Sequence, residues 1–221
     1  MIGFSISCRS PFLVVQFEQP QTMLSWSLTR PGFTVAASVA WLGVRDDDLS
    51  LDIDPIVFLK NRMEAAGLGE AIHLMTSRDV SHHHLTQASF GSATATCLAT
   101  VGLGNAGRVG EHPAGGRAAG TINLLAHVDQ PLTQAAMVEA VSIAAEARTT
   151  AIIDLDWLAQ GKTATGTGTD CIVIAAPCEG APRQFAGLHT DIGAAIGRAV
   201  HDAVWQGGEA WIREKVETAL A

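Results

Sequence analysis

Functional groups are concentrated at residues 165–170, directly before an apolar run at 171–176 that is typical of a buried strand. The sequence T-G-T-G-T-D places three threonine hydroxyls, two glycines and the Asp170 carboxylate at this junction. Hydroxyls, backbone N–H groups and an acid together can position a polar substrate and stabilise charge that develops during a reaction. A simple connection needs the glycines but not this density of functional groups. We therefore expect chemistry at this junction.

A histidine further along the chain suits general-base catalysis. His189 directly precedes Thr190, which we expect to cap a helix, and the positive end of the helix dipole favours a neutral imidazole. A neutral imidazole can accept a proton, and Asp170 could orient it. The alternative is a loop histidine that makes one backbone hydrogen bond. The residue types alone leave both interpretations open.

A run of three histidines, His82 to His84, offers a second kind of chemistry. In an extended segment His82 and His84 share a face, and imidazoles at that spacing can bind a metal. However, Asp79 and Ser81 flank the run, and no matching set of ligands follows at short range. We favour a solvated turn or sheet edge here and predict no metal site.

The glycines of 102–107 fit the G-x-G-x-x-G spacing of dinucleotide-binding loops. The preceding strand is rich in threonine, and no clear helix with an acidic ribose partner follows. The pattern therefore favours a loop in which the backbone and Asn105 approach a ligand. No cofactor is predicted.

Hydrophobic periodicity indicates the elements that would hold these groups. Alternation over 92–101 and 122–128 predicts two strands, and in the second the even-numbered apolar residues oppose Asn123 and His127. Thr133 is expected to cap a helix to about residue 149, with Val138 on its inner stripe. The other predicted elements are paired strands at 12–17 and 23–28 around a turn, strands at 35–44, 71–75 and 171–176, and helices at 56–66, from Thr190 to Trp205, and after Gly207-Gly208.

This order of elements predicts an α/β (α+β) protein. Antiparallel strands come first and strand–helix alternation follows, which favours a mixed β-sheet with antiparallel N-terminal strands, covered by helices. Neither an internal repeat nor a convincing linker is present, so residues 1–221 are expected to form a single domain. The small residues of the last long helix, Gly193 and Gly197, and the tryptophan-bearing tail could equally serve a homodimer contact.

Composition excludes several functional classes. Of the 221 residues, 48% are hydrophobic and 16% charged, which argues against disorder. A formal net charge of −8 disfavours a nucleic-acid partner. Nothing reaches the roughly 18 uninterrupted apolar residues that a membrane span requires. The cysteines form no C-x-x-C motif and no signal peptide is recognisable, so we expect a cytoplasmic protein with reduced thiols.

Taken together, the motifs resemble the adenosylcobinamide amidohydrolase family of the CbiZ type. The segments that carry the resemblance are G-L-G-N-A-G-R-V-G (102–110), A-G-T-I-N (119–123), V-E-A…A-A-E-A-R-T (138–149), G-T-G-T-D (166–170) and G-L-H-T-D-I-G-A-A-I-G-R-A-V (187–200). The resemblance implies hydrolysis of the amide between aminopropanol and the corrin ring, giving adenosylcobyric acid during corrinoid salvage in cobalamin biosynthesis. A corrinoid is then the expected small-molecule partner.

We assign roles within the matched positions as hypotheses. His189, oriented by Asp170, would act as base and then acid, and Thr169 or an activated water would be the nucleophile. Glu146 is a further catalytic candidate. The substrate-binding candidates are Asn105, Thr121, Asn123, Gly166, Thr167, Gly168 and Thr190.

Three alternatives remain open at this point. A lytic zinc held by His82 and His84 would perform the same hydrolysis by another mechanism. A non-hydrolytic corrinoid-binding or transfer protein would use a wide pocket lined with small residues. An amidohydrolase or acyl transferase could also act on another substrate through the same residues.

Overall fold

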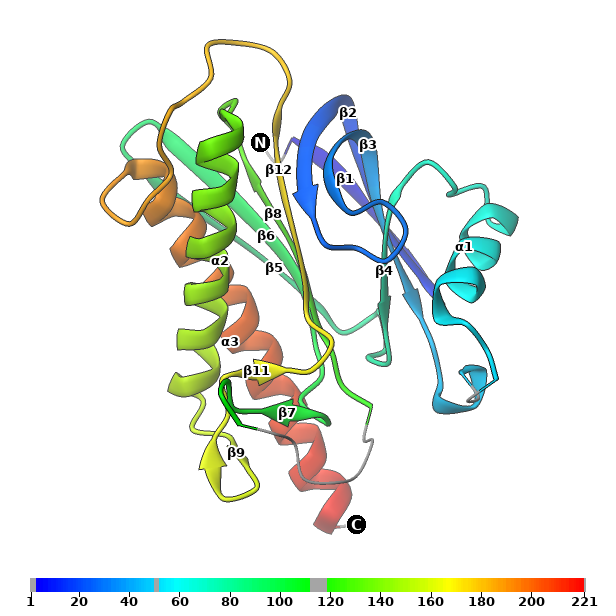
Figure 1. Cartoon of the computed structure of the whole chain (residues 1–221). Helices are drawn as coiled ribbons and strands as arrows, with labels where there is room; N and C mark the ends of the chain where they lie inside the picture. The colour runs from blue at the N-terminus through cyan, green and yellow to red at the C-terminus, as the bar shows by residue number, and fades with distance from the viewer. Residues whose placement is uncertain (1–2, 50–51, 112–118, 221) are drawn as a thin grey trace.

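The fold is given by a computed structural model that describes residues 3–49, 52–111 and 119–220 (Figure 1). Its strands are β1 (Phe4–Arg9), β2 (Phe12–Ser25), β3 (Gly32–Gly43), β4 (Ile72–Thr76), β5 (His83–Phe90), β6 (Ala93–Val101), β7 (Ala106–Gly107), β8 (Ile122–Val128), β9 (Leu158–Ala159), β10 (Lys162–Thr163), β11 (Gly166–Thr167) and β12 (Cys171–Pro177). Its helices are α1 (Pro55–Ala65), α2 (Gln134–Asp154), α3 (Asp191–Leu220) and the short 3-10 turn η1 (Asp46–Asp48).

The main sheet is mixed and has the order β4-β3-β2-β12-β8-β6-β5, with β1 also paired to β2. Strands β12 and β8 run parallel, as do β3 and β4, whereas the N-terminal strands β1, β2 and β3 pair antiparallel. The predicted mixed sheet with antiparallel N-terminal strands is therefore confirmed.

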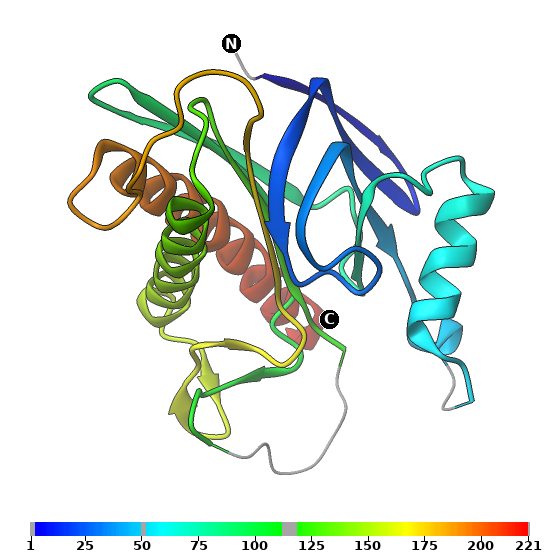
Figure 2. The same cartoon turned by 45° about the horizontal axis from the view of Figure 1, so that its top comes forward.

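The long strand β2 bends in the middle and folds the sheet onto itself. Its pairing with β3 shifts register between Gln16 and Gln21, and the two halves of the strand run in different directions (Figures 1 and 2). The prediction of a hairpin formed by 12–17 and 23–28 is wrong, because both halves pair with β3 instead of with each other. Consecutive apolar runs around a polar turn cannot distinguish a hairpin from one bent strand.

In the described part of the chain, the two halves of the folded sheet and the helices outside them form layers (Figure 2). Helices α2 and α3 cover one face of β12, β8 and β6 through a cluster that includes Ile172 and Leu124. On the opposite face, Val173 and Leu125 pack against Phe17 and Trp41 of the folded-over half. Helix α1 covers the outside of that half. The alternation predicted for β8 is confirmed, since its even-numbered residues face the helices.

Helices α1 and α2 begin at side-chain caps, and the cap of α2, Thr133, was predicted. The Asp54 side chain accepts hydrogen bonds from the backbone N–H groups of α1, which begins with Pro55. Thr133 caps α2 and accepts from Ala136 N at 3.2 Å. Helix α2 continues to Asp154, beyond the predicted end. Its predicted inner stripe is wrong at Val138, which is 56% exposed, because the buried face is offset toward residues such as Ala140 and Ala144.

Helix α3 contradicts the predicted break at Gly207-Gly208. It runs from Asp191 to Leu220 through both glycines. A Cβ on Gly207 would lie 2.6 Å from Val101 Cγ2, and one on Gly208 would lie 2.2 Å from Leu155 Cδ1. These glycines therefore permit close packing of a continuous helix and do not end it. None of the helices within the described residues is both long and apolar enough to cross a membrane.

Candidate active site

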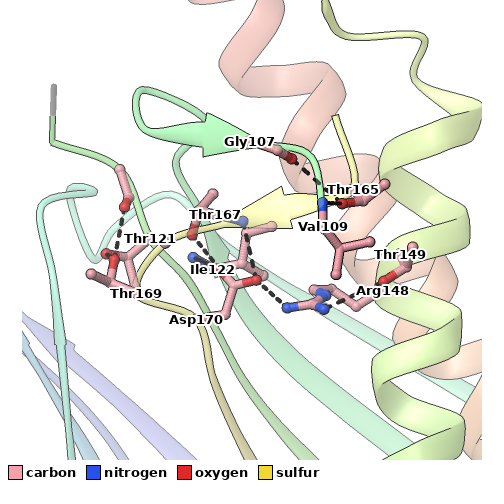
Figure 3. Close-up of polar contacts among 12 residues, drawn as sticks. Gly107, Val109, Thr121, Ile122, Arg148, Thr149, Thr165, Thr167, Thr169 and Asp170 are labelled. Atoms are coloured by element: carbon pink, nitrogen blue, oxygen red, sulfur yellow. Dashed lines mark hydrogen bonds and ion pairs between the residues drawn. The ribbon is translucent and has the colours of Figure 1, made fainter. Parts of the chain in front are cut away.

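The Asp170 carboxylate, just before β12, gathers groups from distant parts of the sequence (Figure 3). Arg148 on α2 forms an ion pair with Asp170 Oδ2, and Thr167 N donates to the same oxygen at 3.2 Å. On the other oxygen, Asp170 Oδ1 accepts from the Thr167 hydroxyl and from Ile122 N, the latter at 3.2 Å. Asp170 thus ties the starts of β8 and β12 to helix α2.

The same arrangement determines what Asp170 can do chemically. Its side chain is 6% exposed, and burial raises its pKa, while the Arg148 guanidinium and the donors from Thr167 and Ile122 oppose that rise. Each carboxylate oxygen already accepts two hydrogen bonds. A carboxylate so occupied has no free lone pair for a proton from a nucleophile. Asp170 is therefore built to position its neighbours and not to act as a general base.

A pair of threonine hydroxyls lies beside this carboxylate. Thr121 Oγ1 and Thr169 Oγ1 are 2.7 Å apart, and Thr169 Oγ1 donates to Gly120 O at 3.0 Å. With that proton engaged, the Thr121 hydroxyl is the donor of the pair. Thr121 is buried whereas Thr169 is exposed. Thr169 is therefore the more accessible residue of the pair, at the end of the sheet where β12 begins.

The glycine-rich segments pack backbone against backbone next to the hydroxyl pair. Gly102 N donates to Thr121 O at 3.0 Å. A Cβ on Gly104 would lie 2.0 Å from Ala119 O, and one on Gly120 would lie 2.5 Å from Gly104 N. Gly104 and Gly120 thus meet a packing requirement of the site, whereas a Cβ on Gly107 would meet nothing within 4 Å.

Two other predicted binding residues complete this edge. Asn105 Oδ1 accepts from Gly168 N at 3.2 Å, which joins the glycine turn to the 165–170 segment. The short strands β7 and β11 pair at Gly166 and Gly107, and a Cβ on Gly166 would lie 2.9 Å from Asp170 Oδ2. Gly166 therefore leaves room for the Asp170–Arg148 ion pair.

Thr165 and Asn123 extend the polar region in two directions. Thr165 Oγ1 accepts from Val109 N at 2.8 Å, which holds the strand pair β7–β11 in place. Asn123 is buried between the two halves of the sheet, where its amide donates to Met75 O at 2.7 Å. The predicted residue Asn123 is thus near the cluster in sequence but has a packing role inside the sheet sandwich.

The predicted pairing of His189 with Asp170 is wrong in this structure. Strand β12 begins directly after Asp170 and spans seven residues, about 20 Å at the usual rise, before the chain turns toward His189. Figure 1 shows β11 near the bottom of the molecule and the start of α3 near the top. His189 is exposed there, so it lies at the opposite end of the sheet from Asp170.

Thr190 and Glu146 also lie outside the cluster. Thr190 caps α3 as predicted, accepting from Gly193 N at 2.9 Å and donating to Gly187 O at 2.8 Å. Glu146 is exposed on α2 and accepts from Ser142 Oγ at 3.2 Å. Arg148, two residues further along α2, pairs with Asp170 and not with Glu146.

Sequence reasoning missed two residues of the site. Arg148 is the cation of the motif A-E-A-R, but the sequence does not show where α2 lies relative to Asp170, so the pairing could not be predicted. Trp26 follows β2, and its indole Nε1 donates to Asp170 O at 2.7 Å. No sequence signal linked Trp26 to the cluster, because the contact spans 144 residues.

The histidine run has the structural role that we favoured. His83 and His84 begin β5, which lies at one edge of the main sheet. His83 Nδ1 lies 2.8 Å from Val80 O, and His82 Nδ1 lies 3.7 Å from Glu214 Oε1. Over the described residues, no group of histidine, cysteine, aspartate or glutamate side chains is arranged to hold a metal ion.

The fold and the cluster together define an α/β protein with polar groups gathered at one end of a folded mixed sheet. The chain belongs to the adenosylcobinamide amidohydrolase (CbiZ) family, whose model matches residues 2–215. It is similar to a curated adenosylcobinamide amidohydrolase of Halobacterium salinarum, with 31% identity over 157 residues. That match covers 66% of this chain and 64% of the Halobacterium protein. The resemblance in the motifs is thereby confirmed.

Solved structures show more distant likeness. The PH0078 protein of Pyrococcus horikoshii matches with 10% identity and a TM-score of 0.48, over 93% of this chain and 82% of its own. A β-aminopeptidase of a Burkholderia species matches with 12% identity and a TM-score of 0.44, over 91% and 79%. An L-aminopeptidase D-Ala-esterase/amidase of Ochrobactrum anthropi matches with 12% identity and a TM-score of 0.42, over 94% and 83%.

Proposed function

We propose that this chain hydrolyses adenosylcobinamide at the amide that joins aminopropanol to the corrin side chain. The observation that carries the proposal is the convergence of family motifs at one place. Segments 102–110, 119–123 and 166–170 and Arg148 of the 138–149 motif meet around the Asp170 carboxylate. A single family match over residues 2–215 supports treating the chain as one functional unit. Corrinoid salvage is the role that such an activity would serve.

The cluster supports a division of labour in amide hydrolysis. Thr169 Oγ1, or a water held by the Thr121–Thr169 pair, attacks the amide carbon and forms the new C–O bond. The C–N bond then breaks, and the amine leaves with the proton released by the nucleophile. When a water attacks, this step gives the acid directly; when Thr169 attacks, a water must then cleave the threonine ester, which releases the acid and restores the hydroxyl. The Asn105 amide nitrogen has no acceptor among the described residues and is placed to donate to the developing oxyanion. Asp170 and Arg148 hold these groups in position.

The proposal is tested with purified protein and adenosylcobinamide. The expected result is release of aminopropanol and adenosylcobyric acid, measured by mass spectrometry, and its loss in Thr169→Val. Binding of the corrinoid with no release in the unaltered chain would favour a transfer protein and contradict the proposal. Activity that disappears with a chelator and returns with zinc would favour the alternative mechanism through His82 and His84.

A further inference from the structure

A large aromatic side chain stands exposed at the rim of the candidate active site. Trp26 follows the last residue of β2, and its indole N–H is held by the Asp170 carbonyl at 2.7 Å. Trp26 is nevertheless 46% exposed. A tryptophan fixed by its polar atom and open to solvent is typical of a binding surface, because the ring offers a large rigid area at low entropic cost.

Two exposed apolar residues continue this surface along β3. Phe33 pairs with Leu24 and Val35 pairs with Thr22, so Phe33 and Val35 follow each other on one face of the sheet. Leu24 packs partly against the cluster beneath α2 and α3, whereas Phe33 and Val35 lie beyond the cover of the helices at 43% and 58% exposure. We call Trp26, Phe33 and Val35 the apolar strip. It carries no charged side chain.

We infer that the apolar strip binds the corrin ring of the substrate, an inference that rests on the proposed function. A corrin is a flat macrocycle with apolar faces and amide-bearing side chains on its rim. The amide to be cleaved lies a few bonds from the ring, so the ring must rest close to the groups that act on the amide. Trp26 is in direct contact with Asp170, and the strip extends away from it.

The opposite end of the sheet provides a comparison. Phe185 and Leu188 are also large, apolar and strongly exposed, at 67% and 66%. They lie in the connection between β12 and α3, at the far end of β12 from Asp170. An apolar surface there cannot present an attached amide to Thr169. Exposure alone therefore does not identify the corrin-binding surface. The contact with the Asp170 cluster distinguishes the apolar strip from Phe185 and Leu188.

The test separates ring binding from positioning of the site. Because Trp26→Ala removes both the ring and the hydrogen bond to Asp170, it is compared with Trp26→Phe, which keeps a ring, and with Phe33→Ser, which does not touch Asp170. Loss of one aromatic stacking partner should raise KM for adenosylcobinamide about tenfold in Trp26→Ala. Phe33→Ser should raise KM with kcat unchanged, and Trp26→Phe should retain most of the affinity. Phe185→Ala serves as the matched control and should behave like the unaltered chain.

Equilibrium dialysis with the coloured corrinoid gives a second readout that does not depend on hydrolysis. Weaker binding in Trp26→Ala and Phe33→Ser, but not in Phe185→Ala, would support the strip. If the unaltered chain hydrolyses the substrate and both strip variants bind it normally, the inference is overturned while the proposed function stands. If the chain binds without hydrolysis and the strip variants bind weakly, the proposed function fails and the strip remains. Absence of any binding overturns both.

Discussion

The two ends of strand β12 contrast in how their polar residues are used. At its start, the Asp170 carboxylate is buried and accepts from Arg148, Thr167 and Ile122. Beyond its other end, His189 is exposed and Thr190 is committed to capping α3. Family motifs lie at both ends, but at the Asp170 end they are joined by contacts between distant segments. Closeness in sequence is therefore a poor guide to closeness in space when a full strand separates two residues.

Of the changes at the two ends of β12, replacing the Asp170 carboxylate should have the largest effect on stability and hydrolysis. Asp170→Asn leaves the partly buried Arg148 guanidinium without its counter-charge, which costs at most about 3–5 kcal/mol of unfolding free energy. Hydrolysis should fall below detection. Urea unfolding and aminopropanol release measure the two effects.

A double variant distinguishes a functional cluster from a merely structural one. Asp170→Asn with Arg148→Met removes both partners of the ion pair, so much of the lost stability should return. Activity should remain absent, because Thr167 and Ile122 still lack the charged acceptor that positions them. Recovery of hydrolysis together with stability would show that the pair serves the fold alone.

The hydroxyl pair should matter for catalysis more than for stability. Thr169→Val keeps the shape of the side chain but loses the hydroxyl, and kcat should fall about 10²–10³-fold or further. The melting temperature should fall only modestly, because Thr169 is exposed and the main structural loss is the acceptor of the buried Thr121 hydroxyl. Thr169→Ser is the matched control and should retain activity. Equal activity in the valine and serine variants would remove Thr169 from the mechanism.

The far end of the sandwich should show a pH effect on stability. His127 packs between Phe4 and Phe17, and burial lowers its pKa to about 4. The unfolded chain takes up the proton near pH 6.5, before the folded chain does, so stability should be lost as the pH falls from about 6.5 towards 4. The loss should reach about 3 kcal/mol.

His127→Gln checks this assignment by urea unfolding at several pH values. Its stability should depend less on pH across that window, and its hydrolysis at neutral pH should match that of the unaltered chain. An unchanged slope in the variant would assign the pH dependence to other groups.

The smallest effect is expected at the upper end of β12. His189→Ala removes an exposed imidazole that lies far from Asp170, so kcat/KM and the melting temperature should both stay unchanged. Glu146→Gln should be equally silent, since its carboxylate contacts Ser142. A large loss of activity in His189→Ala would restore the histidine mechanism.

Local patterns in the sequence were sufficient for much of the fold. Alternation identified strands β6 and β8 and, in β8, the apolar face that the helices cover, and Thr133 and Thr190 marked the helix starts. The bend in β2 could not be foreseen, because it depends on the sheet folding over its own core. The continuity of α3 through Gly207 could not be foreseen either, because the glycine is explained by the close approach of Val101, which only the folded structure shows.

The site was predicted in part for the same reason. The density of hydroxyls at 165–170 pointed to the segment on which the contacts of the candidate site converge, since unusual local composition can be read from the sequence alone. The partners of Asp170 could not be predicted, because Arg148 and Trp26 reach it through tertiary packing. The histidine was assigned by its type and its nearness in sequence, and neither specifies distance across a sheet.

The central claim is that the substrate amide is bound at the Asp170 end of β12. A crystal structure of the Thr169→Val variant with adenosylcobinamide tests it directly. We expect density for the aminopropanol amide within hydrogen-bonding distance of Asn105 and position 169, with the corrin ring against Trp26. Density for the amide beside His189, at the other end of the strand, would contradict it.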